Sequence, residues 1–218
     1  MSRGTVISIC DRTGNMVLPW LEAGYEAITI DLQEQVNPHP ARTHLIQNVT
    51  HLEPEFALKH SPVGVFCFPP CTDTAVSGAR WFRSKGLRAL IQALNIVSAC
   101  QEVAEASGAP WMLENPVSTI ATYWREPDHT FHPSDYTGFE LGDNYTKKTC
   151  LWIGNGFVMP DPFMAATDAP DDRIHKAPPG PDRANFRSAT PMGFARAVYL
   201  ANAPHLKRTL ALSSQERP

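Results

Sequence analysis

Cysteine pairs at the two-residue spacing common in metal sites are absent from this sequence. It contains five cysteines, an odd number, and none lies in a Cys-x-x-Cys motif. A disulfide framework and a zinc site are therefore both disfavoured, and we expect no bound metal. Cys67, Cys100 and Cys150 lie in apolar segments, which is typical of buried thiols. Cys71 differs because it lies beyond an apolar run, where a thiol could be exposed.

A membrane segment and an export signal are also absent. No apolar run approaches the length of a transmembrane helix, and the first residues, MSRGTVISICDRTG, lack the arrangement of a signal peptide. These absences predict a soluble cytoplasmic protein with no membrane partner.

A strong net charge is missing as well. The formal net charge is −3, which weighs mildly against a duplex-binding domain because such domains are often basic. Residues 79–90, ARWFRSKGLRAL, nevertheless contain four basic residues and no acidic one. This run predicts either a local basic stripe or the solvated start of a helix.

The sequence does contain enough apolar residues for a sizeable core. They make up 43% of the 218 residues, which fits one large domain, or one domain with a small appendage, and argues against disorder. The first 32 residues predict a strand at 5–10, a helix within 16–25 that stops at Gly24, and a strand at 26–32 that carries Asp31. Such a strand–helix–strand unit favours a parallel sheet.

The remaining patterns extend this sheet. Further strands are predicted at 43–49, 62–68, 110–115, 129–136 and 148–154. The short connection between the last two predicts that one of them runs antiparallel. A long helix is predicted from Leu87 to Ser107 by apolar residues at helical spacing, namely Leu87, Leu90, Ile91, Leu94, Val97 and Ala104. Residues 190–203 predict a closing helix with Thr190 as its N-cap.

Four polar features follow predicted strands. DRTGN (residues 11–15) follows the first strand, Asp31 the second, PPCTD (69–73) the fourth and ENP (114–116) the fifth. Ligands bind outside the carboxyl ends of strands in an open α/β sheet, so these features should converge at one edge. The first turn holds only Gly14 and is not a G-x-G-x-x-G motif. A ligand without phosphates, such as S-adenosylmethionine, therefore fits better than a dinucleotide, and an ordinary turn is the alternative.

Pro69-Pro70-Cys71 is the most specific of these features. Proline fixes φ and cannot donate to the sheet, so the strand must end on a stiff lip that holds Cys71. A positioned thiolate with an acid–base partner is a nucleophile. Glu114 ends the neighbouring strand and would supply acid chemistry or a hydrogen bond to substrate. A helix-capping or salt-bridged surface carboxylate is the alternative for Glu114. The loop at 72–82 contains Gly78 and small residues, which predicts a lid.

Taken in order along nearly the whole chain, these residues resemble the DNA cytosine-C5 methyltransferases. The matching parts are Pro-Pro-Cys, Glu-Asn-Pro and the first strand–turn–helix–strand with Asp31. The resemblance implies an α/β fold, Rossmann-like and S-adenosylmethionine-dependent, mostly parallel with an antiparallel last strand. It implies that Cys71 attacks C6 of a flipped-out cytosine in DNA and that Glu114 holds N3 and the exocyclic amine. S-adenosyl-L-methionine would give its methyl group to C5.

The resemblance also implies two sets of binding residues. The cofactor set is Cys10, Asp11, Arg12, Thr13, Gly14, Asn15, Asp31, Leu32, Asn48, Val49, Pro69, Ser188 and Thr190. The set for cytosine and DNA is Pro70, Ser77, Arg80, Arg83, Lys85, Asn115, Lys147 and Lys148. Two departures stand out, because Lys147 and Lys148 replace the commoner arginines and Arg12 stands at a usual glycine position.

The resemblance divides the chain into three parts. Residues 1–157 form the cofactor-binding catalytic domain, 158–186 a short loop-like insert and 187–218 a C-terminal helix that completes the domain. The family usually carries a target-recognition domain at the insert, but these residues, about thirty, are too few for an independent domain. We therefore expect low or very short sequence specificity, or recognition through a helper subunit or self-association. Compact phage-encoded and restriction–modification enzymes are similar.

Two other functions stay open. The same chemistry could act on a cytosine nucleotide or on RNA, or deliver a group other than methyl. A non-catalytic, DNA-associated scaffold would keep the fold without the reaction, although the presence of both Cys71 and Glu114 weighs against it.

Overall fold

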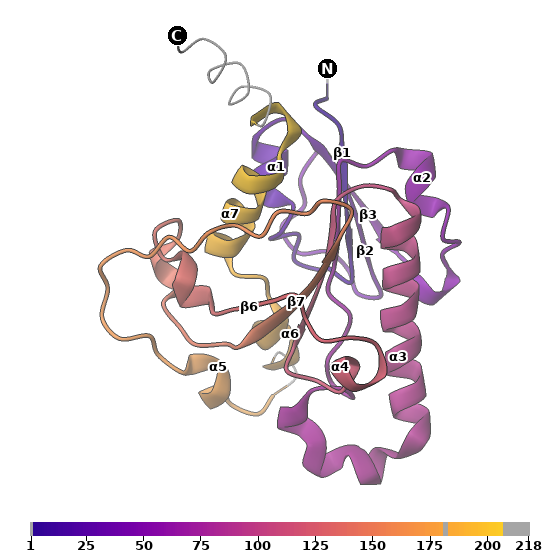
Figure 1. Ribbon diagram of the computed structural model, residues 1–218, viewed down its shortest axis with the longest axis vertical. Helices are drawn as coiled ribbons and strands as arrows, with labels where there is room; N and C mark the ends of the chain where they lie inside the picture. The colour runs from indigo at the N-terminus through magenta and orange to yellow at the C-terminus, as the bar shows by residue number, and fades with distance from the viewer. Residues whose placement is uncertain (1, 181–182, 207–218) are drawn as a thin grey trace.

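The computed structural model describes residues 2–180 and 183–206, which form a seven-stranded sheet with helices on both faces (Figure 1). The strands lie in the order β3-β2-β1-β4-β5-β7-β6. Their bounds are β1 Thr5–Ile9, β2 Glu26–Asp31, β3 Arg42–Ile46, β4 Gly64–Cys67, β5 Trp111–Pro116, β6 His129–Phe131 and β7 Thr149–Gly154. Strands β1 to β5 run parallel, and β7 runs antiparallel to both of its neighbours.

This arrangement confirms the predicted fold class. The sheet is Rossmann-like, because its parallel strands reverse their order at β1 and the antiparallel β7 is inserted before the edge strand. The order reverses where β1 lies between β2 and β4, and ligands bind at such a switch point. The topology therefore directs attention to the carboxyl ends of β1, β2, β4 and β5.

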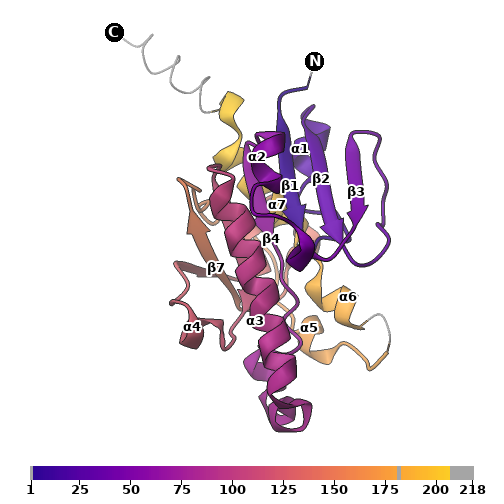
Figure 2. The same ribbon diagram turned by 90° about the vertical axis from the view of Figure 1, so that its right-hand side faces the viewer.

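The helices cover both faces of this sheet. Their bounds are α1 Leu18–Glu22, α2 Phe56–His60, α3 Phe82–Ala106, α4 Ile120–Tyr123, α5 Arg173–Lys176, α6 Arg183–Ser188 and α7 Met192–Asn202. Short 3-10 helices are η1 Val49–His51, η2 Val76–Trp81, η3 Pro133–Tyr136 and η4 Leu141–Asp143. Helices α1 and α7 contact each other on one face, while α3 packs on β4 and β5 on the other (Figure 2).

Alternation along the strands divides the core in two. Val6 of β1 packs in a cluster with Trp20 and Phe194, whereas Ile7, the next residue, packs with Cys100 on the other face. Successive side chains of a strand point to opposite faces, so a strand covered on both faces needs a continuous apolar run. The predicted burial of Cys67, Cys100 and Cys150 is also confirmed.

Helix α3 is buried mainly in its second half, where the interior side comprises Ala93, Val97, Cys100, Val103 and Ala104. The predicted helix is present, but two of the apolar residues that indicated it, Leu87 and Ile91, lie outside the interior side and are 78% and 64% exposed. The first turns extend past the edge of the sheet, where no strand lies beneath them (Figure 2). Helical spacing fixes which side chains share a face, but not how far the covering sheet extends.

The prediction that Thr190 caps the closing helix is also wrong. Helix α7 starts at Met192, preceded by Pro191, and its N-cap residue makes no side-chain hydrogen bond. Instead, the backbone N–H of Gly193 donates to Oδ2 of Asp143 at 2.7 Å. A carboxylate brought from η4 satisfies a helix N-terminus that the local sequence leaves open.

The stretch from 158 to 180 is largely irregular and contains α5. It packs on the sheet domain through the hydroxyl of Tyr136, which donates to the carbonyl of Pro160 at 2.9 Å. The backbone N–H of Gly138 also donates to the carbonyl of Phe163 at 2.8 Å. Residues 181–182 of the predicted insert and 207–218 of the predicted C-terminal part lie outside the described residues, and the three-part division stays a prediction.

Within residues 2–180 and 183–206, none of the helices combines the length and the apolarity that a bilayer crossing requires.

Candidate active site

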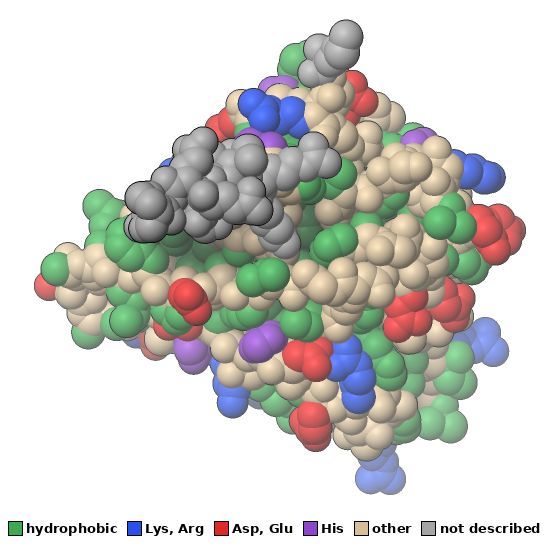
Figure 3. Space-filling model, turned by 45° about the horizontal axis from the view of Figure 1, so that its top comes forward, with side chains coloured by type: hydrophobic (Ala, Val, Ile, Leu, Met, Phe, Trp, Pro, Cys, Tyr) green, Lys and Arg blue, Asp and Glu red, His purple; other side chains and the backbone are tan. Residues whose placement is uncertain are grey.

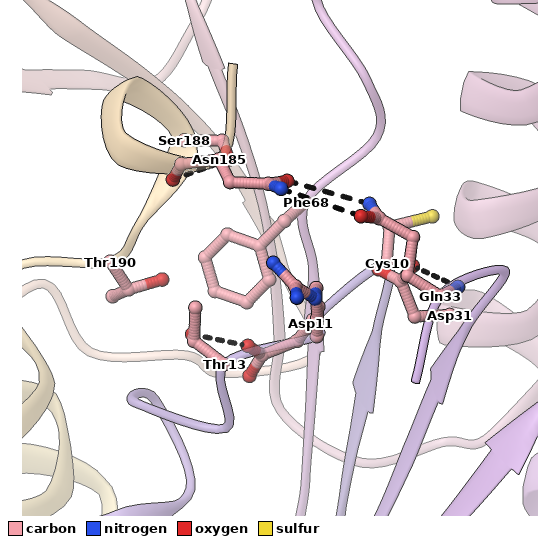
Figure 4. Close-up of a pocket in the computed structure, with 10 residues that line it drawn as sticks. Cys10, Asp11, Thr13, Asp31, Gln33, Phe68, Asn185, Ser188 and Thr190 are labelled. Carbon is pink, nitrogen blue, oxygen red and sulfur yellow. Dashed lines mark hydrogen bonds between the residues drawn. The ribbon is translucent and has the colours of Figure 1, made fainter. Parts of the chain in front are cut away.

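A pocket lies at the carboxyl end of β1, between the ends of β2 and β4 (Figure 4). The space between its lining residues, counted together with the open solvent at its mouth, is about 370 Å³. Its lining residues are Cys10, Asp11, Arg12, Thr13, Asp31, Gln33, Phe68, Asn185, Ser188 and Thr190. All of them except Gln33, Phe68 and Asn185 belong to the predicted cofactor set. The fold thus brings the first turn, the end of β2 and the C-terminal segment to one place.

Asp11 shapes the first wall of this pocket. Its carboxylate accepts hydrogen bonds from Ser8 Oγ at 2.8 Å, Thr13 Oγ1 at 2.9 Å and the backbone N–H of Gly14 at 2.7 Å. The Asp11 residue is only 4% exposed. An aspartate that bonds to its own following backbone forms a local turn. Asp11 therefore holds the loop in shape, and its carboxylate is turned toward the protein.

Arg42 supports the same loop from behind, and sequence reasoning missed it. Its guanidinium donates to the backbone carbonyls of Asp11, Arg12, Thr13 and Val36 and to Thr29 Oγ1, at 2.9–3.4 Å. The residue is 7% exposed, and burial lowers the pKa of the guanidinium while the nearby carboxylate of Asp11 opposes that shift. A Cβ on Gly14 would lie 2.3 Å from Arg42 Nη1, so this position requires glycine. In the sequence, the signal that could have indicated this role is a single arginine directly before a predicted strand.

Two amide contacts close the pocket on its C-terminal side. Asn15 Nδ2 donates to the carbonyl of Thr190 at 2.9 Å. The side-chain amides of Gln33 and Asn185 face each other with reciprocal contacts at 3.4 Å (Figure 4). Residues from the two ends of the chain are thereby joined across the pocket. Single-sequence patterns carry no signal for such long-range pairs.

Six other predicted cofactor residues lie outside the lining. Leu32 is 66% exposed. Asn48 caps η1 by accepting from the backbone N–H of Thr50 at 3.1 Å, and Val49 is 3% exposed in the core. Pro69 is buried, and its carbonyl accepts from Asn115 Nδ2 at 2.9 Å. Gly14 and Asn15 lie behind the wall and hold it.

The Pro-Pro-Cys segment is held by hydrogen bonds to Asn115 of β5. Besides binding Pro69, Asn115 accepts from Thr74 Oγ1 at 3.4 Å, and it is only 1% exposed. The carbonyl of Cys71 accepts from the backbone N–H groups of Thr74 and Ala75, at 3.2 and 2.8 Å. Asn115 of β5 thus holds the segment that follows β4 through these two hydrogen bonds. Cys71 itself is half-buried, so it is neither fully exposed nor part of the core.

Glu114 lies in the second half of β5, two residues before its end, and forms an ion pair with Lys147. Lys147 Nζ is 3.5 Å from Glu114 Oε1, and their side chains are 12% and 13% exposed. Glu114 Oε1 is buried and has no hydrogen-bond partner among the described residues. The alternative of a surface carboxylate does not fit this low exposure. An unbonded buried carboxylate oxygen is available to accept from a ligand.

The charges around Cys71 oppose one another. Burial raises the pKa of the Cys71 thiol, and the carboxylate of Glu114 raises it further. Lys147 and Arg187 lower that pKa by their positive charge. Sequence reasoning also missed Arg187, whose Nε is buried without a hydrogen-bond partner among the described residues. Helix α6 therefore brings a cation toward the thiol as well as Ser188 to the pocket.

The remaining residues predicted to bind cytosine or DNA are more exposed. Pro70, Ser77, Arg80, Arg83 and Lys148 are exposed, and their roles stay predictions. Lys85 Nζ contacts the carbonyl of Thr72 at 2.9 Å and Asp73 Oδ1 at 2.6 Å, so it ties the loop after Cys71 to α3.

The predicted lid is held by backbone contacts. The N–H of Val76 donates to the carbonyl of Val117 at 3.0 Å, and the N–H of Thr119 donates to the carbonyl of Thr74 at 2.9 Å. These bonds fix the first part of the loop to the segment after β5. Closure over a substrate would therefore begin after Val76.

Comparisons with known proteins leave the family open. No protein-family model matches the sequence, and no curated protein matches it at a significant level. One similar solved structure is a mutant DNMT2 of Spodoptera frugiperda, with 16% identity, a TM-score of 0.40 and coverage of 77% of this chain and 54% of that chain. Another is the S. pombe Dnmt2 methyltransferase, with 14% identity, a TM-score of 0.41 and coverage of 79% and 53%.

The chain thus spans about half the length of these two proteins.

The pocket residues fit S-adenosylmethionine. Asp31 presents a carboxylate at a strand end, where ribose hydroxyls are commonly bound. Phe68 offers an apolar ring for the adenine, and Arg12, Ser188 and Thr190 offer polar atoms for the amino-acid end. The absence of a glycine-rich phosphate loop suits a ligand without phosphates. Among the residues that the structure describes, no group of three His, Cys, Asp or Glu side chains is placed to hold a metal ion.

Proposed function

We propose that the protein transfers a methyl group from S-adenosylmethionine to C5 of cytosine in DNA. The supporting observation is a half-buried thiol, Cys71, whose pKa is raised by burial and by the carboxylate of Glu114, a largely buried side chain on the neighbouring strand. Both lie at the edge that carries the Asp31 pocket. A nucleophile, a carboxylate for the pyrimidine edge and a pocket for a nucleoside are the parts that this reaction needs.

Each residue has a defined task in this proposal. S-adenosylmethionine, when bound, supplies an electrophilic methyl group. Cys71 adds as thiolate to C6, Glu114 holds N3 and the exocyclic amine, and C5 becomes nucleophilic. After methylation, the C5 proton leaves to a base and Cys71 leaves by elimination. Lys147 balances the charge of Glu114 and favours the thiolate.

Target recognition is proposed to be minimal. The chain between β7 and α7 holds only short helices and irregular segments in its described part. We propose low or very short sequence specificity, with self-association or a helper subunit as the route to any longer site. A compact phage-encoded or restriction–modification enzyme would suit this form, acting in the cytoplasm of a bacterial or phage-infected cell. The five free cysteines fit such a reducing compartment.

Covalent trapping tests the proposal. The protein is incubated with S-adenosylmethionine and DNA that carries 5-fluorocytosine, because fluorine cannot leave C5 as a proton does. We expect an adduct on a denaturing gel that is lost in Cys71→Ser and kept in Cys150→Ser. Circular dichroism and thermal melting of both variants verify that they fold. An adduct that survives Cys71→Ser, or no adduct with folded, cofactor-binding protein, would contradict the assignment.

The small recognition region also favours a second candidate, the same chemistry on a cytosine nucleotide or on RNA. Transfer of a labelled methyl group to DNA, RNA and dCMP, measured side by side, separates the two. Transfer to DNA at least about tenfold faster than to the others is expected, a difference in barrier of about 1.4 kcal/mol. Faster transfer to RNA or dCMP would favour the second candidate.

A further inference from the structure

An arm projects from the molecule next to Cys71. It consists of residues 76–91, namely η2 and the first turns of α3, and it extends beyond the sheet (Figures 1 and 2). Gly86 interrupts the helix with φ 74° and ψ 176°. This backbone region is essentially restricted to glycine, so the bend in the arm is encoded in the sequence. Lys85 fixes the arm to Thr72, the residue after Cys71.

The arm presents an exposed tryptophan. Trp81 is 54% exposed, and the guanidinium carbon of Arg80 lies 5.0 Å from the centre of its ring. Tryptophan is highly buried on average, and the large rings of this protein, such as Trp20 and Trp152, follow that rule. An exposed ring beside a cation is a surface suited to stacking with a flat partner.

The arm also concentrates unpaired positive charge. Between Thr74 and Gln101 the sequence has four basic residues and no acidic one. Arg80, Arg83 and Arg88 are exposed and form no ion pair with the described residues. On the face shown in Figure 3, by contrast, basic and acidic side chains are interspersed. The arm is therefore locally basic on a protein with a net charge of −3.

We propose that this arm binds single-stranded DNA, with a base stacked on Trp81 and phosphates held by Arg80, Arg83 and Arg88. The inference rests on the proposed function. In it, the arm contacts the DNA, as a target-recognition domain usually does. A base must be unpaired to offer its face to a tryptophan, which favours a single strand over a duplex. Stacking tolerates every base, so the arm predicts binding with little sequence preference.

A second copy of this chain is the competing occupant, because Val76, Leu87 and Ile91 are also exposed on the arm. Pairing of two identical arms would bring their arginines together, and like charges oppose such an interface. Phosphates neutralise the same arginines. Charge complementarity therefore favours DNA.

Fluorescence anisotropy with a labelled oligothymidylate of about twelve nucleotides tests the arm, since single-strand sites span roughly 4–16 nucleotides. The probe lacks cytosine, so binding does not depend on the catalytic pocket. Trp81→Ala should weaken binding about tenfold, and Trp81→Phe should restore most of it. Leu58→Ala, at another exposed apolar position, is the matched control and should bind like the parent.

Salt dependence separates stacking from charge. Trp81→Ala should leave the slope of log K against log salt unchanged, because no phosphate contact is lost. Arg83→Ala should reduce the slope by about 0.7, the value for one phosphate on a single strand. Lys59→Ala, at an exposed lysine of α2, is the charge control and should leave it unchanged.

Several results would overturn the proposal. These are unchanged binding in Trp81→Ala, tighter binding of a duplex or an oligouridylate than of oligothymidylate, and a dimer that Trp81→Ala dissociates while oligothymidylate binding stays the same. Thermal stabilisation by S-adenosylhomocysteine is measured in parallel and should be equal in the parent and Trp81→Ala. If S-adenosylhomocysteine does not stabilise the parent, that result counts against the proposed function. The oligothymidylate measurement does not depend on this result, so the two failures can be distinguished.

Discussion

At the scale of single residues, the charge of Cys71 depends on its neighbours. Burial and Glu114 raise the pKa of the thiol, so the free protein holds less thiolate than its two nearby cations alone would favour. A cytosine edge bound to Glu114 would weaken that opposition by engaging the carboxylate. The nucleophile would then become more reactive when its substrate is present.

Substitution of the two neighbours should shift the reactivity of Cys71 in opposite directions. Glu114→Gln removes a negative charge, so the pKa of Cys71 falls and alkylation by iodoacetamide at neutral pH becomes faster. Lys147→Met removes a positive charge, so that pKa rises and alkylation slows. Peptide mapping by mass spectrometry across a pH series measures both. Glu22→Gln, at an exposed site, should match the parent.

Glu114→Gln should also lower methyl transfer by roughly 10²-fold or more, as expected for loss of an acid–base group. Faster alkylation together with slower catalysis would distinguish this role from general damage to the fold. Equal alkylation rates in Glu114→Gln and the parent would contradict the coupling.

Arg42 should stabilise the whole fold as well as the loop that forms the pocket wall. Arg42→Met removes a donor from buried acceptors, the carbonyl of Asp11 and Thr29 Oγ1, and from partly buried carbonyls, at about 1–3 kcal/mol for each group left unsatisfied. We expect the free energy of unfolding to fall by about 3 kcal/mol or more, measured by urea denaturation. Arg196→Met, at an exposed arginine of α7, should change it by less than about 1 kcal/mol. A small effect of Arg42→Met would mean that water replaces the guanidinium.

At the scale of elements, helix α7 depends on a carboxylate from elsewhere in the chain. Asp143 accepts from Gly193 N–H and is 9% exposed. Burial raises its pKa, an effect larger than the opposing hydrogen bond. For an acid whose pKa is raised on folding, the stabilising contribution is full below the unfolded pKa and is lost as pH rises through the folded pKa.

Asp143→Asn should therefore become relatively more stable than the parent as pH rises from acid to neutral, because it keeps an acceptor oxygen without the charge. Asp143→Ala should be less stable than Asp143→Asn by about 1 kcal/mol, the typical value of a helix cap. Urea denaturation of the three proteins at acid and neutral pH measures both effects. A stability difference between parent and Asp143→Asn that does not change with pH would contradict the burial of an ionised carboxylate.

At the scale of the whole molecule, the pocket joins the two ends of the chain. The segment at 185–190 meets the loop after β1 through the contact of Thr190 with Asn15, and it meets the segment after β2 through the contact of Asn185 with Gln33. A ligand in this pocket would contact both, so its binding should stabilise the global fold as well as the loop.

S-adenosylhomocysteine at about 100 times its dissociation constant should stabilise the protein by about 2.7 kcal/mol. Hydrogen exchange should slow in the segment at 185–190 as well as in the loop after β1. Asp31→Asn should weaken binding at least about tenfold, since hydrogen bonds to charged groups contribute about 1.5–3 kcal/mol. Asp168→Asn, at an exposed aspartate away from the pocket, is the control. Protection of the β1 loop alone would contradict a shared pocket.

The sequence by itself determined which segments form strands and helices and which residues lie where the strands end. Apolar periodicity predicts the strands and helices, and prolines and polar residues mark where strands end, because these depend on neighbours in the chain. Cys71, Glu114 and Asp31 were found in this way. The positions of the strand ends relative to one another also followed, since parallel strands direct their carboxyl ends to one edge.

Only the tertiary structure decided what surrounds those residues. The support from Arg42, the cap from Asp143 and the cation from Arg187 join positions far apart in the chain, and no local periodicity encodes such pairs. Exposure of Trp81 and Leu87 likewise depends on where the covering sheet stops. Residue type and local spacing choose the elements, whereas charge balance and burial arise from distances that only the folded chain sets.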